Sequence, residues 1–487
     1  MSNISDISQY NAAKVLGFFK ELSSVPHGSG NTKAIADICV NFAKERHLDY
    51  RKDEVGNVII FKKASLGAES RDTVIIQGHL DMVCVKTSDC TKNMFTDPID
   101  IMTDGNIIWA DKTSLGADDT VAIAIALAIL DDDTLQHPPI CAVFTVDEET
   151  DMSGARNLDI SGVPGNMMIN IDSEDEGYIT CGCAGAIKAR CEFSYLKVSP
   201  DPDDVFYKLK ISGLLGGHSG IEIANNRANA IRLLARLIYG LSLKWNIKLC
   251  EFDGGLFDNA IPVSAEAIVS VNKGDALAFE SLAAKHEKLF RYEYKNSDPD
   301  IKVTASAYEG EVSNCLNHQE TKIIMRCLSS VPDGLRKFDE EFKVPLVSSN
   351  IGIAHLSSEV FCFTSFIRSN ESGQKEEVYD MLKSMVEHDG GTAIVINQYP
   401  EWEYRSDSNL KQICKEAYLK LYKKDIPEVI THGGLECALF SDKKPDLDII
   451  SIGPSIREIH SARENVSIQS INNVYMLVCE ILNILAL

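Results

Sequence analysis

The sequence predicts an α/β protein in which a domain built on a mixed sheet is interrupted by an inserted α+β domain. Three observations support this fold class. Strand and helix signals alternate up to about residue 186, antiparallel strand signals with a few helices follow, and alternation returns near residue 392. Alternating strands and helices are typical of a parallel or mixed sheet with helices on its faces. We therefore expect one discontinuous domain over residues 1–186 and 392–487 and an inserted domain over residues 187–391.

The first segment contains helices and strands in turn. Apolar residues that recur every three or four positions predict amphipathic helices, and short apolar runs between polar residues predict buried strands. On this basis we expect helices over residues 10–23, 32–48 and 117–131, and strands over Asn57–Lys62, Thr73–Val83, Ile140–Val146 and Met167–Asp172.

The middle of the chain has a different character, because strand patterns dominate it and few helices interrupt them. This combination is typical of an antiparallel sheet covered by helices. We expect strands over residues 187–213, Ala265–Val271, 301–308, 321–328 and 359–368, and helices over Asn225–Tyr239 and Asp275–Glu293. The first domain then resumes with the strand Thr392–Gln398, the helix Ser408–Leu421, the strand Ile449–Ile452 and a final helix from Ile468.

The bulk composition is that of a soluble globular protein of two or three domains. Hydrophobic residues make up 45% of the 487 and charged residues 24%, and the net charge is −23. Nucleic acids and anionic membranes attract basic surfaces, so we expect neither as a partner. The chain starts with a polar segment unlike a signal peptide, and its apolar stretches 121–130 and 476–487 are shorter than a membrane span. We therefore expect a cytoplasmic protein.

A histidine and an aspartate stand where a predicted strand ends, in the segment Gln77-Gly78-His79-Leu80-Asp81. Side chains alternate faces along a strand, so His79 and Asp81 point to the same face. An imidazole at a strand end is a ready metal ligand, and a carboxylate beside it can fix its tautomer. A histidine that only forms a hydrogen bond is the alternative. The metal interpretation therefore depends on the rest of the chain.

Two adjacent acids, Asp118 and Asp119, stand directly before the apolar helix in the segment Leu115-Gly116-Ala117-Asp118-Asp119. Either acid could simply cap the helix, because a carboxylate is favourable at a helix N-terminus. Two acids are more than capping requires. One of them is therefore available for another role.

Further acids and a histidine follow other apolar strands: Asp147-Glu148-Glu149, Asp172, and His460 after a Gly-Pro turn. Solvated ends of strands are the alternative explanation. In open α/β sheets, however, ligand-binding residues gather at the carboxyl ends of the strands. Two histidines with several carboxylates suit zinc, manganese or cobalt, and the number of acids favours two bridged metal ions over one. The residues alone predict a two-metal hydrolytic site.

The order of these motifs resembles a known family. The co-catalytic zinc metallopeptidases, which include aminoacylases and carboxypeptidases, have similar motifs to Gly78-His79-Leu80-Asp81, Leu115-Gly116-Ala117-Asp118, Glu148-Glu149, Ile171-Asp172-Ser173-Glu174, and Gly453-Pro454 with His460. The aminoacyl-histidine dipeptidases within that family resemble this chain further at Gly182-Cys183-Ala184-Gly185, Gly216-Gly217-His218-Ser219-Gly220 and Gly433-Gly434-Leu435-Glu436-Cys437. The resemblance covers essentially the whole chain. It implies a mixed-sheet dizinc peptidase domain with an inserted domain that serves as lid and dimerisation surface.

The resemblance also implies a set of metal ligands. His79 and Asp172 would be the terminal ligands of one metal, Glu149 and His460 those of the other, and Asp118 would bridge them. Two divalent cations are therefore expected as cofactors. Zinc is the first choice, with manganese or cobalt as alternatives.

The neighbours of these ligands receive roles from the same resemblance. Asp81 would orient His79. Glu148 would be the general base, which takes a proton from a metal-activated water and returns it to the leaving amine. The peptide bond after Asp118 is typically cis in this family. Asp119 departs from the subgroup, which more often has an uncharged residue there, and adds charge near the metals.

The inserted domain carries three residues that the resemblance links to the substrate. His218 would stabilise the oxyanion from across a dimer interface, and Asn259 and Arg368 would hold the substrate carboxylate, which a guanidinium can pair bidentately. Taken alone, His218 and Asn259 are ordinary turn residues and Arg368 is a solvated charge at a strand end. A lid implies a homodimer and a motion between domains. For the substrate amino group, two acids come into question, Glu436 and Glu174.

These assignments predict a metallo-dipeptidase that cleaves unblocked dipeptides, including those that end in histidine. The alternative within the family is an aminotripeptidase, a carboxypeptidase or an N-acyl-amino-acid deacylase. The alternative from another class is a non-catalytic binding protein on a degenerate peptidase fold. Degeneration usually removes ligands or the base, whereas all of these residues are present here.

Overall fold

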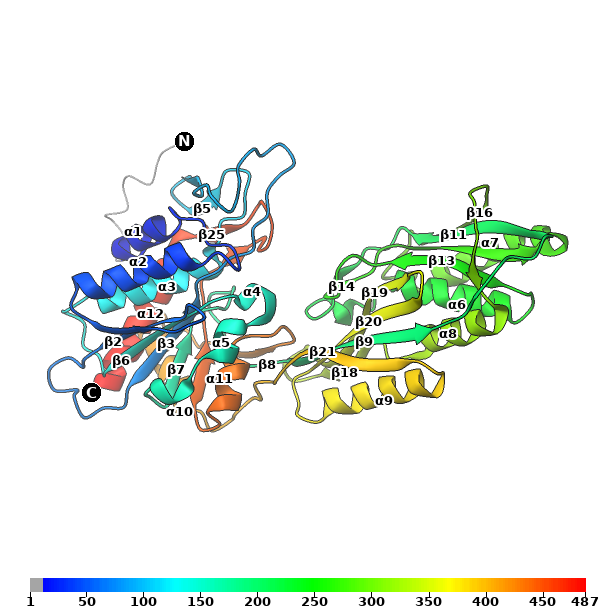
Figure 1. Ribbon diagram of the computed structural model, residues 1–487. Coiled ribbons are helices and arrows are strands. Elements are labelled where there is room, and N and C mark those ends of the chain that lie inside the picture. The colour runs from blue at the N-terminus through cyan, green and yellow to red at the C-terminus, as the bar shows by residue number, and fades with distance from the viewer. Residues whose placement is uncertain (1–11) are drawn as a thin grey trace. The chain divides into compact units, whose positions relative to one another are not determined.

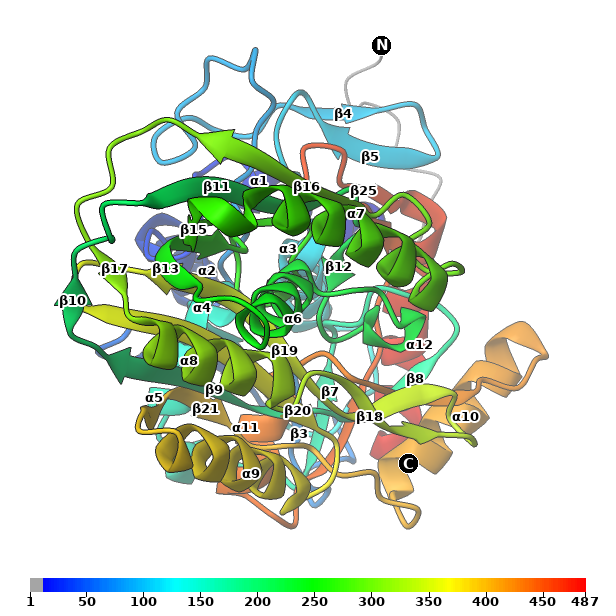
Figure 2. The same cartoon turned by 90° about the vertical axis from the view of Figure 1, so that its right-hand side faces the viewer.

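The computed structural model describes residues 12–487, apart from five side chains in the segment 277–283. The chain divides into two compact units (Figures 1 and 2). The first unit comprises the described part of Met1–Cys183 together with Tyr404–Ile430 and Leu435–Leu487. The second comprises Ala184–Glu403 and Thr431–Gly434.

The first unit is built on a mixed sheet. Its described strands are, in spatial order, β1 (Asp49–Lys52), β2 (Val58–Lys62), β6 (Ile140–Thr145), β3 (Val74–His79), β7 (Met167–Asn170), β23 (Asp448–Ser451), β8 (Ile179–Cys183) and β22 (Glu428–Thr431). β3 runs parallel to β6 and β7, and β23 runs parallel to β7, whereas β1, β2 and β8 pair antiparallel. The predicted α/β class with a mixed sheet is confirmed.

The parallel strands place their carboxyl ends at one edge of this sheet. β3 ends at His79, β6 at Thr145, β7 at Asn170 and β23 at Ser451. Each predicted metal-binding motif except the one at Asp118 follows one of these ends. The topology therefore brings segments far apart in the sequence to the same edge.

Helices cover both faces of the mixed sheet. One face packs on α1 (Ala13–Leu22), α2 (Lys33–Glu45), α3 (Ala117–Leu130), α10 (Asn409–Tyr422) and α12 (Ile468–Ala486). Val74 and Ile76 of β3 belong to the core that these helices form, whereas Ile75, which points to the opposite face, does not. The short helices α4 (Glu148–Asp151), α5 (Ser153–Asn157) and α11 (Cys437–Lys443) complete the unit.

Two helices of the first unit are strongly apolar. α3 is buried along almost its whole length, as the sequence predicts for a core helix. α12 has the length and hydropathy of a membrane span, but half of its apolar window is buried and it contacts α3 and α10. Such contacts are those of a core helix. A separate small sheet has the strand order β24 (Ile456–Arg457), β25 (Asn465–Ser467), β5 (Ile107–Ala110) and β4 (Ile101–Thr103).

The second unit is an antiparallel sheet with helices. Its described strands are β16 (Lys302–Tyr308), β11 (Asp204–Ser212), β15 (Ala265–Asn272), β13 (Lys248–Gly254), β19 (Val344–Leu356), β20 (Val360–Ser369), β9 (Gly185–Ser194) and β21 (Thr392–Tyr399), with β18 (Gly334–Asp339) paired to β19. The helices α6 (Ala230–Ser242), α7 (Ala276–Glu293), α8 (His318–Ser330) and α9 (Gln374–His388) pack on it. Two short pairs join β10 (Lys197–Val198) to β17 (Cys315–Leu316) and β12 (Gly217–His218) to β14 (Ala260–Ile261).

One predicted element of the second unit is wrong. Residues 321–328, predicted as a strand, lie within the helix α8. The buried residues Thr321, Ile324, Met325 and Leu328 recur at helical spacing, and the Asn317 side chain caps the helix by accepting the N–H of Glu320. A short run rich in apolar residues does not by itself distinguish a strand from a helix.

Other elements differ from the prediction in extent. The long strand β19 and the helices α9 and α11 are absent from it. Of the helix predicted over residues 10–23, the first two residues lie outside the described residues. We expect the first domain to resume at residue 392 with the strand that is β21 in the structure, but β21 pairs antiparallel with β9 in the second sheet. A strand pattern in the sequence does not identify the neighbouring strand, so the sequence could not assign β21 to either sheet.

Candidate metal centre

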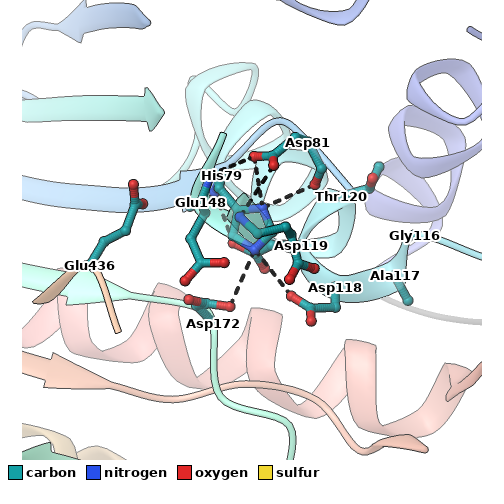
Figure 3. A network of polar contacts seen from close by, with 12 residues as sticks. His79, Asp81, Gly116, Ala117, Asp118, Asp119, Thr120, Glu148, Asp172 and Glu436 are labelled. Atoms are coloured by element: carbon teal, nitrogen blue, oxygen red, sulfur yellow. Dashed lines mark hydrogen bonds and ion pairs between the residues drawn. The ribbon is translucent and has the colours of Figure 1, made fainter. Parts of the chain in front are cut away.

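His79 is the last residue of β3 and is 1% exposed. Its Nδ1 lies 3.0 Å from the backbone carbonyl oxygen of Asp81, so Nδ1 carries the proton and donates it. Nε2, which faces the acids, becomes a lone-pair donor to a metal once it is deprotonated. It lies 3.1 Å from Asp118 Oδ1 and 3.6 Å from Asp172 Oδ1 (Figure 3). The imidazole is therefore oriented as a ligand by a residue two positions along the chain.

Asp81 is fully buried and its carboxylate holds the segment that carries the predicted base. Oδ1 accepts the backbone N–H of Glu148 at 3.0 Å, and Oδ2 accepts the N–H of Glu149 at 3.3 Å and the Ser29 hydroxyl at 2.8 Å. Oδ1 also lies 3.5 Å from His79 Nδ1. The backbone carbonyl of Asp81 thus lies closer to His79 than the Asp81 carboxylate does. The carboxylate mainly holds the turn after β6, a role that the sequence did not predict.

Asp118 lies in the first turn of α3, where its backbone is not helical, and the Asp118–Asp119 peptide bond is cis. Its two carboxylate oxygens face different histidines. Oδ1 lies 3.1 Å from His79 Nε2, and Oδ2 lies 3.4 Å from His460 Nε2. The cis bond predicted at this position is confirmed.

The second histidine, His460, approaches Asp118 from the segment after β24. Its Nε2 lies 3.0 Å from the Glu149 carboxylate oxygens. His460 has a φ of 55°, in the left-handed region that non-glycine residues seldom occupy and that is enriched at functional sites. The segment after the Gly-Pro turn therefore aims an imidazole at the acids that follow β6.

The predicted ligands form overlapping groups. His79, Asp118 and Asp172 present ligand atoms within 4.8 Å of one another, and so do Asp118, Glu149 and His460. Asp118 is the shared member. Two imidazole nitrogens with carboxylate oxygens are a donor set that suits zinc, so the residues present fit two cations.

Crowding and burial raise the pKa of most carboxyls in the metal-free protein. Burial, and then the charge of Asp118, raise the pKa of Glu149 to about 7. Burial raises the pKa of Asp172 to about 6 against the favourable contact with His79. Asp118 behaves differently, because its hydrogen bonds to His460 and His79 outweigh burial and lower its pKa. Such a concentration of buried acids is costly unless a cation or protons compensate it.

Glu148 starts the short helix α4, directly after Asp147, whose φ of 57° marks a sharp turn. Strand β6 has ended by this point, so adjacent residues no longer point to opposite faces. Glu148 and Glu149 therefore both reach a common group with His79. Burial, and then the charges of Glu149 and Asp172 against that of His79, raise the pKa of Glu148 well above its usual value.

The two acids considered for the substrate amino group differ in exposure. Glu436 is fully buried, and its Oε2 accepts Gln77 Nε2 at 2.6 Å and the Thr145 hydroxyl at 2.5 Å. It stands to one side of the cluster and braces β3 against β6 (Figure 3). Glu174 is partly exposed, and burial with the charges of Asp118 and Asp172 raises its pKa to about 8.

Asp119 adds an acid behind the ligands. It is 2% exposed, and its Oδ2 accepts the backbone N–H of His79 at 3.1 Å. Gly78 permits this contact, because a Cβ at that position would lie 2.6 Å from Asp119 Oδ2 and 2.6 Å from Ala122 Cβ. Burial, and then the charge of Asp172, raise the pKa of Asp119 well above its usual value. The departure from the subgroup thus supports the backbone of a ligand.

The three residues predicted to contact the substrate carboxyl and oxyanion lie in the second unit. His218 in β12 pairs with Ala260 of β14, and Ser219 donates its N–H to the Asn259 carbonyl at 2.8 Å, so His218 and Asn259 are neighbours. Arg368 lies on β20 and is 4% exposed, not solvated. Its Nη1 donates to the Tyr399 hydroxyl at 3.0 Å, whereas its buried Nε has no partner among the described residues.

Sequence reasoning missed several residues that support this site. Glu464, Ser29 and Gln77 carry no local pattern, because their partners lie far away in the chain. In the second unit, the buried His432 bonds Ser348 Oγ and Asn370 Oδ1 at 2.8 Å each. Burial, and then the charges of Arg368 and His218, lower the pKa of His432 to about 3. The N–H groups of residues 115–118 need an acceptor, and this need is the only sign in the sequence of a residue such as Glu464. It does not indicate which residue supplies the acceptor.

Comparison with known proteins gives matches along nearly the whole chain. The model of peptidase family M20/M25/M40 matches residues 75–483. The cytosol non-specific dipeptidase of Escherichia coli (strain K12) is 32% identical over 480 residues, which cover 98% of this chain and 99% of that protein. An aminoacylhistidine dipeptidase from Vibrio alginolyticus has a TM-score of 0.86 at 31% identity, over 99% of this chain and 98% of that one. A tripeptidase from Staphylococcus aureus, at 16% identity, shares the fold with a TM-score of 0.56 over 98% of this chain and 100% of that one.

The extent of these matches confirms the family that the motifs predicted and the class of peptide-bond hydrolase. The family match includes every segment that contributes a predicted metal ligand, from His79 to His460. The chain therefore belongs to peptidase family M20/M25/M40.

Proposed function

We propose that this chain is a metallo-dipeptidase that uses two divalent cations, with zinc as the first choice, to hydrolyse unblocked dipeptides. One observation carries the two-metal assignment: Asp118 presents Oδ1 to His79 and Oδ2 to His460, at 3.1 and 3.4 Å from their Nε2 atoms. A carboxylate shared in this way has the geometry of a bridging ligand. Two relatives of nearly full coverage carry the name of dipeptidases, which supports the substrate class.

The ligand assignment follows from the two groups around Asp118. His79 and Asp172 would hold one cation, and Glu149 and His460 the other. When bound, the cations supply Lewis acidity that polarises the scissile carbonyl and lowers the pKa of a water.

Glu148 is the proposed general base. It stands beside a ligand but makes no side-chain hydrogen bond to the described residues, so its carboxylate can face the attacking water. Its raised pKa suits a group that takes the proton of that water and then delivers it to the leaving amine. Asp81, by holding the N–H groups of Glu148 and Glu149, keeps the base and a ligand in register.

Arg368 is the proposed partner of the substrate carboxylate. A buried guanidinium whose Nε has no partner in the described chain needs an anion, and a carboxylate pairs with it bidentately. Tyr399 fixes the other side of the group through Nη1. Asn259 is proposed as the second contact to the carboxylate.

His218 is the proposed donor to the oxyanion. The backbone N–H groups of Gly220 and Ile221 both point to its Nδ1 at 3.2 Å, which makes Nδ1 the acceptor and places the proton on Nε2. This tautomer can donate a hydrogen bond without the imidazole being charged. We propose that the donor acts across a homodimer, as the resemblance implies.

An exposed apolar surface in the second unit supports the homodimer. Around β12 and β14 the side chains of Leu215, Ile221, Leu256 and Phe257 are each at least 60% exposed. Contiguous exposed apolar side chains are typical of protein interfaces. For the substrate amino group we propose Glu436 or Glu174: Glu436 has a buried Oε1 without a partner among the described residues, and Glu174 is partly exposed. We further propose a cytoplasmic location, in line with the cytosolic relative.

A substrate panel tests this proposal. Protein stripped of metal would be assayed with zinc, manganese or cobalt added back, on free dipeptides, tripeptides and N-acetylated dipeptides. We expect metal-dependent cleavage of free dipeptides. Glu148→Gln should lower kcat by about 10²–10⁴-fold, the contribution of a general base, while zinc binding persists.

Glu428→Gln is the matched control, because Glu428 is a paired carboxylate of the same unit that bonds Lys411 and Tyr404. We expect this control to keep its kcat. A preference for N-acetylated substrates, or full activity of Glu148→Gln, would refute the proposed function.

A further inference from the structure

Glu464 is a buried carboxylate directly before β25 and is 3% exposed. It makes none of the contacts expected of a metal ligand. Instead its two oxygens accept four consecutive backbone N–H groups of residues 115–118, at the N-terminal end of α3. Oε2 accepts those of Leu115 and Gly116 at 2.7 and 2.8 Å, and Oε1 accepts those of Ala117 and Asp118 at 2.7 and 3.3 Å.

The turn needs such an acceptor. The first N–H groups of a helix have no partner within the helix, and burial makes an unpaired N–H costly. Gly116 adopts a φ of 71°, which turns the successive N–H groups of this segment inward to one point. A carboxylate at this point satisfies all four donors and is favoured by the helix dipole.

Glu464 also belongs to the segment that carries the second histidine. The segment between β24 and β25 starts at Glu458 and includes His460, and the N–H of Glu464 bonds the Ser461 carbonyl at 3.2 Å. β25 is paired in turn with β24 and β5. One side chain therefore joins the backbone that presents Asp118 to the segment that presents His460.

We propose that Glu464 is a positioning residue that sets the distance between Asp118 and His460 and thereby the metal affinity of the centre. The inference rests on the proposed two-metal site and adds to it a residue that touches neither metal nor substrate. Asp118 and His460 are separated by more than 300 positions in the sequence. The four hydrogen bonds through Glu464 hold the two segments in a fixed relation before any cation binds.

Two substitutions change this side chain in different ways. Glu464→Gln keeps the shape but replaces one oxygen by an amide nitrogen. In either orientation that nitrogen faces two backbone N–H groups, donor against donor. Glu464→Asp keeps the charge but withdraws the carboxylate by one methylene, so it cannot reach all four donors at once.

Zinc affinity of the chelator-stripped protein is the decisive measurement, by competition with a chromophoric chelator. Partners that orient ligands typically contribute 10–100-fold to metal affinity. We expect Glu464→Gln to weaken zinc binding by about 10–100-fold and Glu464→Asp to weaken it less. Glu428→Gln is the control, since it removes a paired carboxylate of the same unit that bonds Lys411 and Tyr404 and is remote in sequence from the turn. Urea unfolding of each metal-free variant measures the accompanying loss of stability.

The outcomes separate this inference from the proposed function. If the unaltered protein fails to bind two ions of zinc, manganese or cobalt, the proposed function is overturned. If it binds them and Glu464→Gln binds them as tightly, the positioning role is refuted. An equal loss of affinity in Glu428→Gln, at equal loss of stability, refutes it as well. Should Glu464→Gln fail to fold, Glu464→Asp is judged by the same comparison.

Discussion

Replacement of Asp81 by asparagine tests whether its buried carboxylate holds the segment of Glu148 and Glu149. Its oxygens accept the N–H of Glu148 at 3.0 Å, the N–H of Glu149 at 3.3 Å and the hydroxyl of Ser29 at 2.8 Å. Asparagine has nearly the same shape but turns one oxygen into an NH₂ group. Whichever way the amide is oriented, its nitrogen faces a backbone N–H, which is a donor against a donor. The backbone carbonyl that orients His79 is untouched.

The size of the effect follows from these contacts. A hydrogen bond to a charged group contributes about 1.5–3 kcal/mol, and a buried donor left unpaired costs about 1–3 kcal/mol. Asp81→Asn keeps the bond on one oxygen, loses at least one backbone bond, and retains the Ser29 contact because a hydroxyl can also accept. We expect a loss of about 3 kcal/mol in the free energy of unfolding. Ser29→Ala removes one bond without creating a donor clash and should cost about half as much.

Activity should respond in a particular way. Because Asp81 holds the segment of Glu148 and Glu149 and not the substrate, zinc-loaded Asp81→Asn should lose about 10–100-fold in kcat with little change in KM. Initial rates of hydrolysis of a free dipeptide over a range of substrate concentrations give both kcat and KM. A kcat equal to that of Ser29→Ala would contradict the reasoning, since only Asp81→Asn disturbs the backbone bonds to Glu148 and Glu149. So would a raised KM at unchanged kcat.

Two further outcomes follow from the charges. Glu149 has a folded-state pKa raised by burial from 4.5 to about 7, so the metal-free protein should lose roughly 3 kcal/mol of stability as the pH rises through that window. Saturating zinc should remove this loss, as urea unfolding with and without zinc would reveal, and a flat profile in the metal-free protein would contradict it. Arg368→Lys should raise KM for free dipeptides by about tenfold, because an ammonium cannot pair a carboxylate bidentately. A dipeptide amide, which lacks the carboxylate, should show no difference between Arg368→Lys and the unaltered protein.

The edge of the mixed sheet was predictable because its evidence is local. His79, Glu148 with Glu149, and Asp172 each stand at or just after the end of an apolar strand pattern. Such a pattern predicts both the strand and the candidate ligand at its carboxyl end. Parallel strands place such ends together, so the sequence could predict convergence without knowing the strand order. The same logic failed for β21, whose signal was correct but whose partner was unknown.

Residues whose role lies in a distant contact left no such trace. Glu464 serves the turn of Asp118 from more than 300 positions away, and Gln77 serves Glu436 over a similar separation. A buried carboxylate and an exposed one look alike in sequence. The sequence therefore could not show that Glu436, which stays a predicted substrate contact, is buried.

The alternation of β3 explains how a metal centre and a core can share one strand end. Residues 74, 76 and 78 face the helical core, where Gly78 permits the N-terminus of α3 to approach within contact of the strand. Gln77 and His79 face the opposite side, where Gln77 bonds Glu436 and His79 meets Asp118 and Asp172. A larger residue at position 78 would push α3 away, and with it the turn that carries Asp118. Because the proposed bridging carboxylate of Asp118 comes from the helix that packs on the core side of the strand, packing behind the sheet sets the geometry of the site at its edge.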